Sequence, residues 1–141
     1  MRPGMSKECV PEILAAADVT TSLFDDVPAM QANSANKFFD ALAAGCPIAL
    51  NYDGWQADLV RQFDIGMVLP HGDLKAAADG LLSGLADRTW LRMAGDRARE
   101  VGLERFDRDK LAVQFECVLR EAVDQHKAHR GRPVPFPWKS A

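Results

Sequence analysis

The sequence lacks a long hydrophobic run. Its 141 residues contain no apolar stretch of eighteen or more, so we predict no transmembrane helix. The first nine residues also lack the apolar segment that is typical of a secretory signal. We therefore expect a cytoplasmic location.

Cysteine and histidine are scarce, with three residues of each type. The cysteines are odd in number, far apart and without a CxxC pair, so we expect reduced thiols rather than a disulfide framework. No histidine has the spacing to a cysteine that a zinc site needs, and we expect no metal. The residues concerned are Cys9, Cys46, Cys117, His71, His126 and His129.

Positive charge and phosphate-loop motifs are also missing. The net charge is -3, which argues against nucleic acid as a partner. The chain contains no GxGxxG, Walker or GxSxG pattern, so dehydrogenases, P-loop enzymes and serine hydrolases lose their main support. What is present is 48% hydrophobic and 26% charged residues, a composition typical of one folded domain.

Hydrophobic patterning predicts an α/β chain in which strands alternate with helices. β-branched and apolar runs predict strands at residues 18–24, 48–50 and 66–69, and apolar periodicity predicts helices at 10–17, 34–44 and 55–63. Three further helices are expected near Leu74, near Trp90 and after Asp107. This order predicts a partial Rossmann-like domain with a short parallel sheet of about three strands and a helical C-terminal half. We assign that domain to residues 1–130, and an extended or disordered proline-rich tail to 131–141.

The helix at 34–44 has the clearest boundaries. Ser34 is a good N-cap residue. Gly45 stands where a left-handed residue ends a helix, and Pro47 prevents continuation. Ligands of parallel sheets bind beyond the carboxyl ends of the strands, where this helix begins.

A helix start at that edge is a natural seat for phosphate, because its amides are free and its dipole end is positive. Lys37 adds a charge, and Asp40 lies one turn further along, where its carboxylate can accept hydrogen bonds from sugar hydroxyls. The residues before Lys37 are small and polar, which lets a ligand approach the backbone: Asn33, Ser34, Ala35 and Asn36.

Each of these residues also has a purely structural interpretation. Ser34 caps a helix with or without a ligand, and Lys37 and Asp40 are spaced to pair on a solvated face. Trp55, after the Gly54 turn, either stacks on a base or fills the edge of the core. The basic run 127–132 either contacts acidic lipid or ends a frayed helix.

The stretch 34–47, SANKFFDALAAGCP, resembles the signature of family 4 glycosyltransferases of the GT-B fold, closest to those that build bacterial surface polysaccharides. The flanks are similar too, at 11–19, at 48–60 followed by 66–68, and at 105–107, so the resemblance covers roughly residues 10–123. It implies the second half of a C-terminal Rossmann-like domain, a nucleotide-diphosphate-sugar donor, retention at the anomeric carbon, and neither a cofactor nor an obligatory metal.

The resemblance also implies roles for individual residues. The diphosphate seat corresponds to Ser34, Ala35, Asn36 and Lys37, and Asp40 corresponds to the acidic residue that holds the ribose. Asn33, Gly54 and Trp55 are candidates for contacts to the base or sugar, and no catalytic residue is assigned. The family often has a second carboxylate eight positions before Asp40; here that position is Ala32, which Asn33 or Gln31 replaces only in part.

The family's N-terminal acceptor domain and the earlier strands of its C-terminal domain have no counterpart in the chain. We therefore expect the donor-binding portion of a transferase in cell-surface polysaccharide or lipopolysaccharide synthesis, inactive alone and, in the full enzyme, peripheral at the inner membrane. The open edge of the 18–24 strand, or an uncovered helix face, suggests a homo-oligomer. Two alternatives stay open: a donor-binding subunit of a split transferase, and a non-catalytic interaction module.

Overall fold

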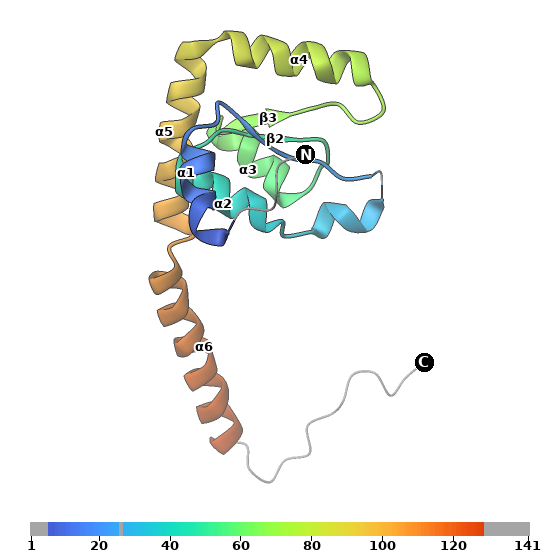
Figure 1. The fold of residues 1–141 in the computed structure, drawn as a ribbon. Coiled ribbons are helices and arrows are strands. Elements are labelled where there is room, and N and C mark those ends of the chain that lie inside the picture. The colour runs from blue at the N-terminus through green and yellow to red at the C-terminus, as the bar shows by residue number, and fades with distance from the viewer. Residues whose placement is uncertain (1–5, 26, 129–141) are drawn as a thin grey trace, which may run out of the picture. The chain divides into compact units, whose positions relative to one another are not determined.

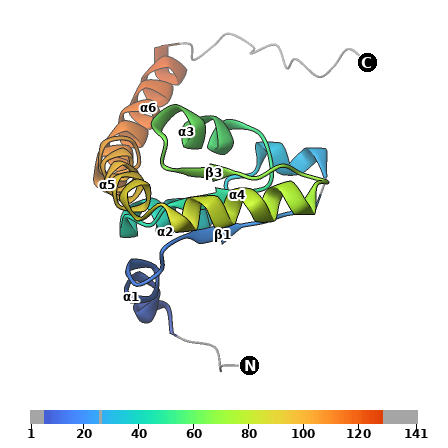
Figure 2. The same cartoon turned by 90° about the horizontal axis from the view of Figure 1, so that it is seen from above.

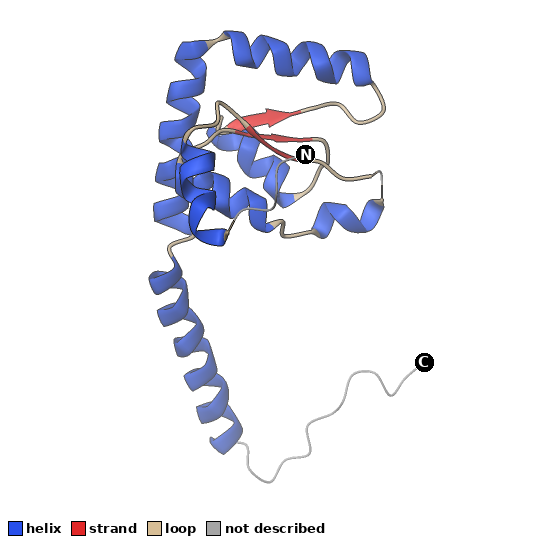
Figure 3. Ribbon diagram, in the orientation of Figure 1, coloured by secondary structure: helices blue, strands red, loops and turns tan. Residues whose placement is uncertain are grey.

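The computed structural model describes residues 6–25 and 27–128, which fall into two units (Figure 1). The first unit extends to Phe106 and the second begins at Asp107. Figure 3 shows how helices dominate both. In the first unit the elements are η1 (Lys7–Cys9), α1 (Val10–Ala15), β1 (Thr20–Ser22), η2 (Pro28–Ala32), α2 (Asn36–Ala44), β2 (Ile48–Leu50), α3 (Trp55–Phe63), β3 (Gly66–Val68), α4 (Leu74–Ala86) and α5 (Arg88–Arg105); in the second unit it is α6 (Arg108–Ala128).

The sheet is parallel and has the order β1-β2-β3. Thr20 lies opposite Ile48, and Ile48 lies opposite Gly66, so the three strands run in step. The predicted α/β class, the three-stranded parallel sheet and the helical C-terminal half are therefore confirmed. Gly66 is required by the close pairing, since a Cβ there would collide with the carbonyl oxygen of Ile48.

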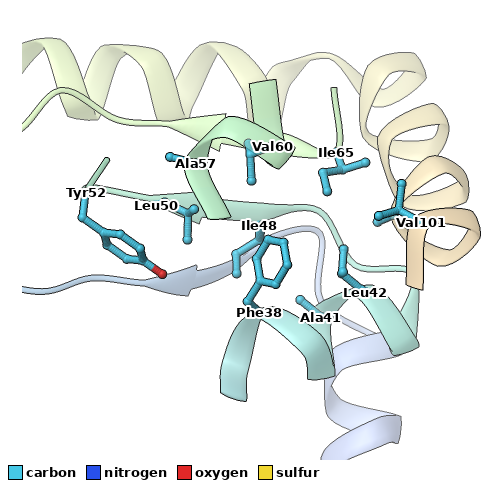
Figure 4. Packing of buried hydrophobic residues seen from close by; sticks show 11 residues of the cluster. Phe38, Ala41, Leu42, Ile48, Leu50, Tyr52, Ala57, Val60, Ile65 and Val101 are labelled. Carbon is cyan, nitrogen blue, oxygen red and sulfur yellow. The ribbon is translucent and has the colours of Figure 1, made fainter. Parts of the chain in front are cut away.

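Helices cover both faces of this sheet. Ile48 and Leu50 are fully buried on one face, where Phe38 of α2 and Val60 of α3 pack against them (Figure 4). Alternation along the strand directs Ala49 to the opposite face. Figure 2 shows α4 alongside β3, and the helix approaches there so closely that a Cβ on its Gly84 would meet the Met67 sulfur at 2.5 Å.

The contact between α2 and α5 depends on two glycines. Gly45 ends α2 with a left-handed φ of 67°, as its position in the sequence predicts. Its carbonyl oxygen lies so near α5 that a Cβ on Gly95 would stand only 2.5 Å away. Because neither glycine carries a side chain there, α5 can lie directly over the end of α2.

Parts of this unit differ from the sequence interpretation. The segment 25–33, for which the sequence predicts neither a strand nor a helix, contains the 3₁₀ helix η2. The apolar stripe of α4 forms the predicted helix but buries no residue, and Leu74 is 87% exposed. The proposed tail at 131–141 lies outside the described residues. None of the helices described is long and apolar enough to span a membrane.

In the second unit, α6 begins as predicted after Asp107, whose carboxylate accepts a 2.9 Å hydrogen bond from the Lys110 amide. Such a cap satisfies an amide that would otherwise have no partner at the helix start. No residue of α6 is buried. Its large apolar side chains are all at least two-fifths exposed: Leu111, Val113, Phe115, Val118, Leu119 and Val123.

Cys46 is one of three free cysteines and the only buried one, as expected for reduced thiols. Its sulfur lies 3.5 Å from the Ala17 carbonyl oxygen, which links the end of the α1 segment to the start of β2. Burial raises the pKa of this thiol above its ordinary value, because a thiolate is poorly solvated in the core.

We predict that Gly95→Ala lowers the free energy of unfolding by about 1–3 kcal/mol, because the new methyl group overlaps the Gly45 carbonyl. Gly80→Ala is the matched control on α4. There the nearest atom to a Cβ is 3.9 Å away, so a gain of up to about 1 kcal/mol is expected from helix propensity. Denaturant unfolding of both variants checks this, and equal effects would refute the close contact.

We also predict that the free energy of unfolding falls as the pH rises, because the buried Cys46 thiol resists ionisation. A thiol whose folded pKa is raised keeps its full contribution below the unfolded pKa of about 8.5 and loses it as the pH rises toward the folded value. Thermal unfolding between about pH 7 and pH 9.5 should therefore show a decline that Cys46→Ala reduces. Cys117→Ala, at an exposed cysteine, should leave the decline unchanged.

Candidate functional site

The first two strands are joined beyond their last paired residues by one side chain. The Asn51 carboxamide accepts a hydrogen bond from the Phe24 amide at 2.8 Å and donates one to the Phe24 carbonyl at 2.9 Å. The side chain thus extends the β1–β2 ladder by one position. Its effect is to hold the segment that leaves β1 against the turn that leaves β2.

The third strand end is tied to the same turn. The Leu69 amide donates to the Leu50 carbonyl at 2.6 Å, and His71 Nδ1 lies 3.0 Å from the Asn51 carbonyl oxygen, a distance at which a protonated Nδ1 donates to it. Between the three strand ends lies a hollow of about 110 Å³. Its polar lining consists of Asp25, Gln31, Asn51, Tyr52, Asp53, Arg61 and His71.

Two of the charged side chains at this hollow form a solvated ion pair. Arg61 contacts Asp53 at 2.6 Å, and both side chains are more than half exposed. An ion pair of this kind contributes at most about 1 kcal/mol. Within the described residues, no group of three or more His, Cys, Asp or Glu side chains could hold a metal ion.

A buried polar relay connects the sheet to the start of α2. The Tyr52 hydroxyl donates to Gln56 Oε1 at 2.9 Å and lies 3.3 Å from the Ser22 hydroxyl. The Gln56 amide donates in turn to the Ala35 carbonyl at 3.4 Å. Burial raises the pKa of Tyr52, so its hydroxyl stays protonated and available as a donor. Together these bonds fix the residue that precedes α2.

Gly54 and Trp55 also contact the segment that precedes α2, at Gln31 and Asn33. The Gly54 backbone, at φ 110°, approaches Gln31 so closely that a Cβ would collide with the Gln31 carbonyl. The Trp55 indole N–H donates to the Asn33 carbonyl at 3.2 Å. Its ring is half-buried among three phenylalanine rings: Phe38, Phe39 and Phe106. In the described structure, Trp55 therefore occupies the edge of the core.

The helix start differs from the sequence prediction. Ser34 is not the N-cap: α2 begins at Asn36, the capping position belongs to Ala35, and no side chain makes a capping hydrogen bond within the described part of the chain. The reason lies in the contacts at Gln56 and Trp55, which hold the carbonyls of residues 33 and 35 and so determine where the chain can turn into the helix.

Four of the predicted ligand residues remain accessible at this start. Ser34, Asn36, Lys37 and Asp40 are exposed, whereas Ala35 is buried and Asn33 is half-buried. No ion pair joins Lys37 to Asp40 among the described residues, although their spacing allows one. The first amides of α2 have no intrahelical acceptor.

Asn36 and Asp40 also line a second hollow, of about 470 Å³, between α2 and α1. Its opposite wall is apolar and is formed by Val10, Pro11 and Leu14. The sequence interpretation gave these three residues no role in a site, because α1 is distant in sequence from α2. The structure therefore groups Asn36 and Asp40 with α1, and groups Gly54 and Trp55 with the segment before α2.

Comparison with known proteins gives two partial similarities, and no family model matches the chain. Over 88 residues the chain is 32% identical to an exopolysaccharide phosphotransferase of Streptomyces coelicolor, a match that covers 61% of this chain and 9% of that protein. It is 28% identical over 88 residues to N-acetyl-alpha-D-glucosaminyl L-malate synthase of Bacillus anthracis, covering 62% of this chain and 23% of that enzyme. The chain thus spans less than a quarter of either relative.

We predict that Asn51→Ala lowers the free energy of unfolding by about 1–3 kcal/mol, because it leaves two groups of the Phe24 backbone without partners. Hydrogen exchange should quicken at the Phe24 amide while amides in α5 keep their protection. Asp53→Ala, at an exposed side chain in the same turn, should leave Phe24 exchange unchanged. Slow exchange of the Phe24 amide in Asn51→Ala would show that the two hydrogen bonds of the Asn51 side chain are dispensable.

Proposed function

We propose that this chain forms the nucleotide-sugar donor-binding portion of a retaining glycosyltransferase in polysaccharide or sugar-conjugate synthesis. The observation that carries the proposal is the uncapped start of α2, with Ser34, Asn36, Lys37 and Asp40 exposed around it. The two partial relatives, one named for exopolysaccharide and one for a glucosaminyl product, support the same class of substrate.

The start of α2 supplies what a diphosphate needs. The amides of Asn36 and Lys37 have no intrahelical acceptor, and no side chain competes for them in the described structure. The positive end of the helix dipole favours an anion there, and the Lys37 ammonium adds a full charge. Ser34, which does not cap the helix, keeps its hydroxyl available for a phosphate oxygen.

The hollow beside α1 supplies what a nucleoside needs. The Asp40 carboxylate accepts hydrogen bonds from the two neighbouring hydroxyls of a ribose, and charge-assisted bonds of this kind are the stronger ones. Across the hollow, Val10, Pro11 and Leu14 offer an apolar wall against which a flat base can lie. In this arrangement the base lies beside α1. Asn33, Gly54 and Trp55 do not touch the ligand; their contacts with one another and with Gln31 fix the segment that leads into α2.

For the transfer itself, the chain's contribution is electrostatic. Charge develops on the diphosphate as the bond to the sugar breaks, and donors already oriented toward that group lower the barrier. The α2 amides and Lys37 fill this role in the proposal, so the residues of the chain stabilise the leaving group without a metal. Positioning of the acceptor belongs to the remainder of such a transferase.

The test is calorimetric titration of the chain with UDP and with GDP, repeated with Asp40→Ala and Lys37→Ala. We expect one nucleotide to bind saturably and each substitution to weaken it by about ten- to a hundredfold, since each removes a charged partner worth about 1.5–3 kcal/mol. The matched controls are Asp79→Ala and Lys75→Ala on α4, where both side chains are exposed and pair with each other. These should leave binding unchanged.

Binding of neither nucleotide would contradict the donor site and favour a non-catalytic module with the same fold. Ala32 is the feature that favours that alternative, because it places a methyl group where the resembling family often has a carboxylate. Binding that Asp40→Ala leaves intact would place the nucleotide elsewhere, with the hollow at Asn51 and His71 as the next site to mutate.

A further inference from the structure

Two neighbouring side chains at the start of α3 hold alternate carbonyls of the segment that leads into α2. The Trp55 indole N–H donates to the Asn33 carbonyl at 3.2 Å. The Gln56 carboxamide donates to the Ala35 carbonyl at 3.4 Å. Since both donors belong to α3, both of these carbonyls point toward that helix.

A hydrogen bond to a carbonyl also fixes the amide of the same peptide unit. A trans peptide is planar, and its C=O and N–H bonds point in opposite directions. The Asn33 carbonyl shares its peptide with the Ser34 amide, which therefore points away from α3. The Ala35 carbonyl shares its peptide with the Asn36 amide, which points away from α3 for the same reason. Among the described residues neither amide finds a backbone acceptor, and both Ser34 and Asn36 are exposed.

We propose that Trp55 and Gln56 are positioning residues for the proposed donor site, where they aim two backbone amides at a diphosphate. The inference rests on the proposed function, which seats the diphosphate at the start of α2. Donors that are oriented before a ligand arrives bind it more tightly, because aligning them costs nothing at the moment of binding. Neither side chain is free to touch the ligand itself, since Gln56 is buried and the Trp55 ring packs among phenylalanine rings.

The Gln56 carboxamide is held in its turn by a contact with Tyr52. The Tyr52 hydroxyl donates to Gln56 Oε1 at 2.9 Å, so the carboxamide nitrogen is the group that faces Ala35. The Ala35 carbonyl also accepts a hydrogen bond from the Phe38 amide at 3.0 Å, in the first turn of α2. The peptide that carries the Asn36 amide is thus fixed both by its own helix and by α3.

A purely structural role for the two side chains makes a different prediction. If their hydrogen bonds only kept the segment folded, the loss of either bond would loosen the start of α2 and affect both amides together. Positioning instead assigns one amide to each side chain, Ser34 to Trp55 and Asn36 to Gln56. The two roles are therefore distinguished amide by amide.

The experiment is NMR titration of the full chain with inorganic pyrophosphate, and with UDP and GDP, followed at individual backbone amides. In the unsubstituted chain we expect the Ser34 and Asn36 amide protons to shift downfield as they donate to the anion. Gln56→Met removes the donor to Ala35, while the Tyr52 hydroxyl keeps an acceptor in the Ser22 hydroxyl at 3.3 Å. This variant should reduce the shift at Asn36 alone and weaken pyrophosphate binding about three- to tenfold, because part of one charge-assisted hydrogen bond is lost.

Trp55→Phe is the reciprocal variant, because it keeps an aromatic ring and removes the indole N–H. It should reduce the shift at Ser34 and leave the shift at Asn36. Trp90→Phe is the matched control on α5, where the indole donates to the Asp64 carboxylate at 3.0 Å, and it should change neither amide. Circular dichroism checks that each variant is folded, and either of the two α3 variants tests the inference if the other is not.

The outcomes separate this inference from the proposed function. Binding in which both variants keep both shifts would overturn the positioning role and leave the donor site standing. Equal loss at the two amides in either variant would also overturn it, since a loosened segment explains that result. Binding that leaves both amides unmoved in the unsubstituted chain contradicts this inference alone, whereas no binding of any of the three ligands contradicts the inference and the proposed function together.

Discussion

The arrangement of the candidate site depends on two carbonyl groups that the core holds. The carbonyls of Asn33 and Ala35 accept hydrogen bonds from Trp55 and Gln56, and Gly54 makes room for this segment by lacking a side chain. The chain must then turn into α2 at Asn36. These contacts place Ala35, which has no capping side chain, at the N-cap, so the first amides of α2 have no acceptor from the helix or from a capping side chain. Everything proposed for Lys37 and Asp40 follows from that orientation.

Local chemistry was enough to predict much of the fold. Gly45 and Pro47 allow only one end for α2, and the apolar residues 48–50 between them and the next turn allow only a short buried strand; both predictions are confirmed. The predicted limits of the helix at 55–63 agree with α3. These features depend on backbone freedom and hydrophobicity within a few residues, which the sequence states directly.

Features that depend on distant contacts escaped prediction. Ser34 is a favourable cap by type, but tertiary hydrogen bonds from α3 move the N-cap by one residue, to Ala35. Val10, Pro11 and Leu14 gain their place opposite Asp40 only because α1 packs against α2. The apolar residues of α4 show a second limit of sequence reasoning. Their spacing correctly predicts a helix, but it does not predict that none of its side chains is buried. The roles of the site residues in binding a donor stay predictions.

The two hydrogen bonds between the Asn51 side chain and the Phe24 backbone affect how the sequence of such a protein can change in evolution. The last hydrogen bonds between the β1 and β2 segments are made by the Asn51 side chain. They fix the point at which the chain leaves β1 and enters the segment 25–35. Beyond that anchor, insertions and deletions can accumulate without disturbing the strand register. Evolution can thus change the length and composition of this segment while the three strands and their pairing are kept, with Asn51 marking the boundary between the two.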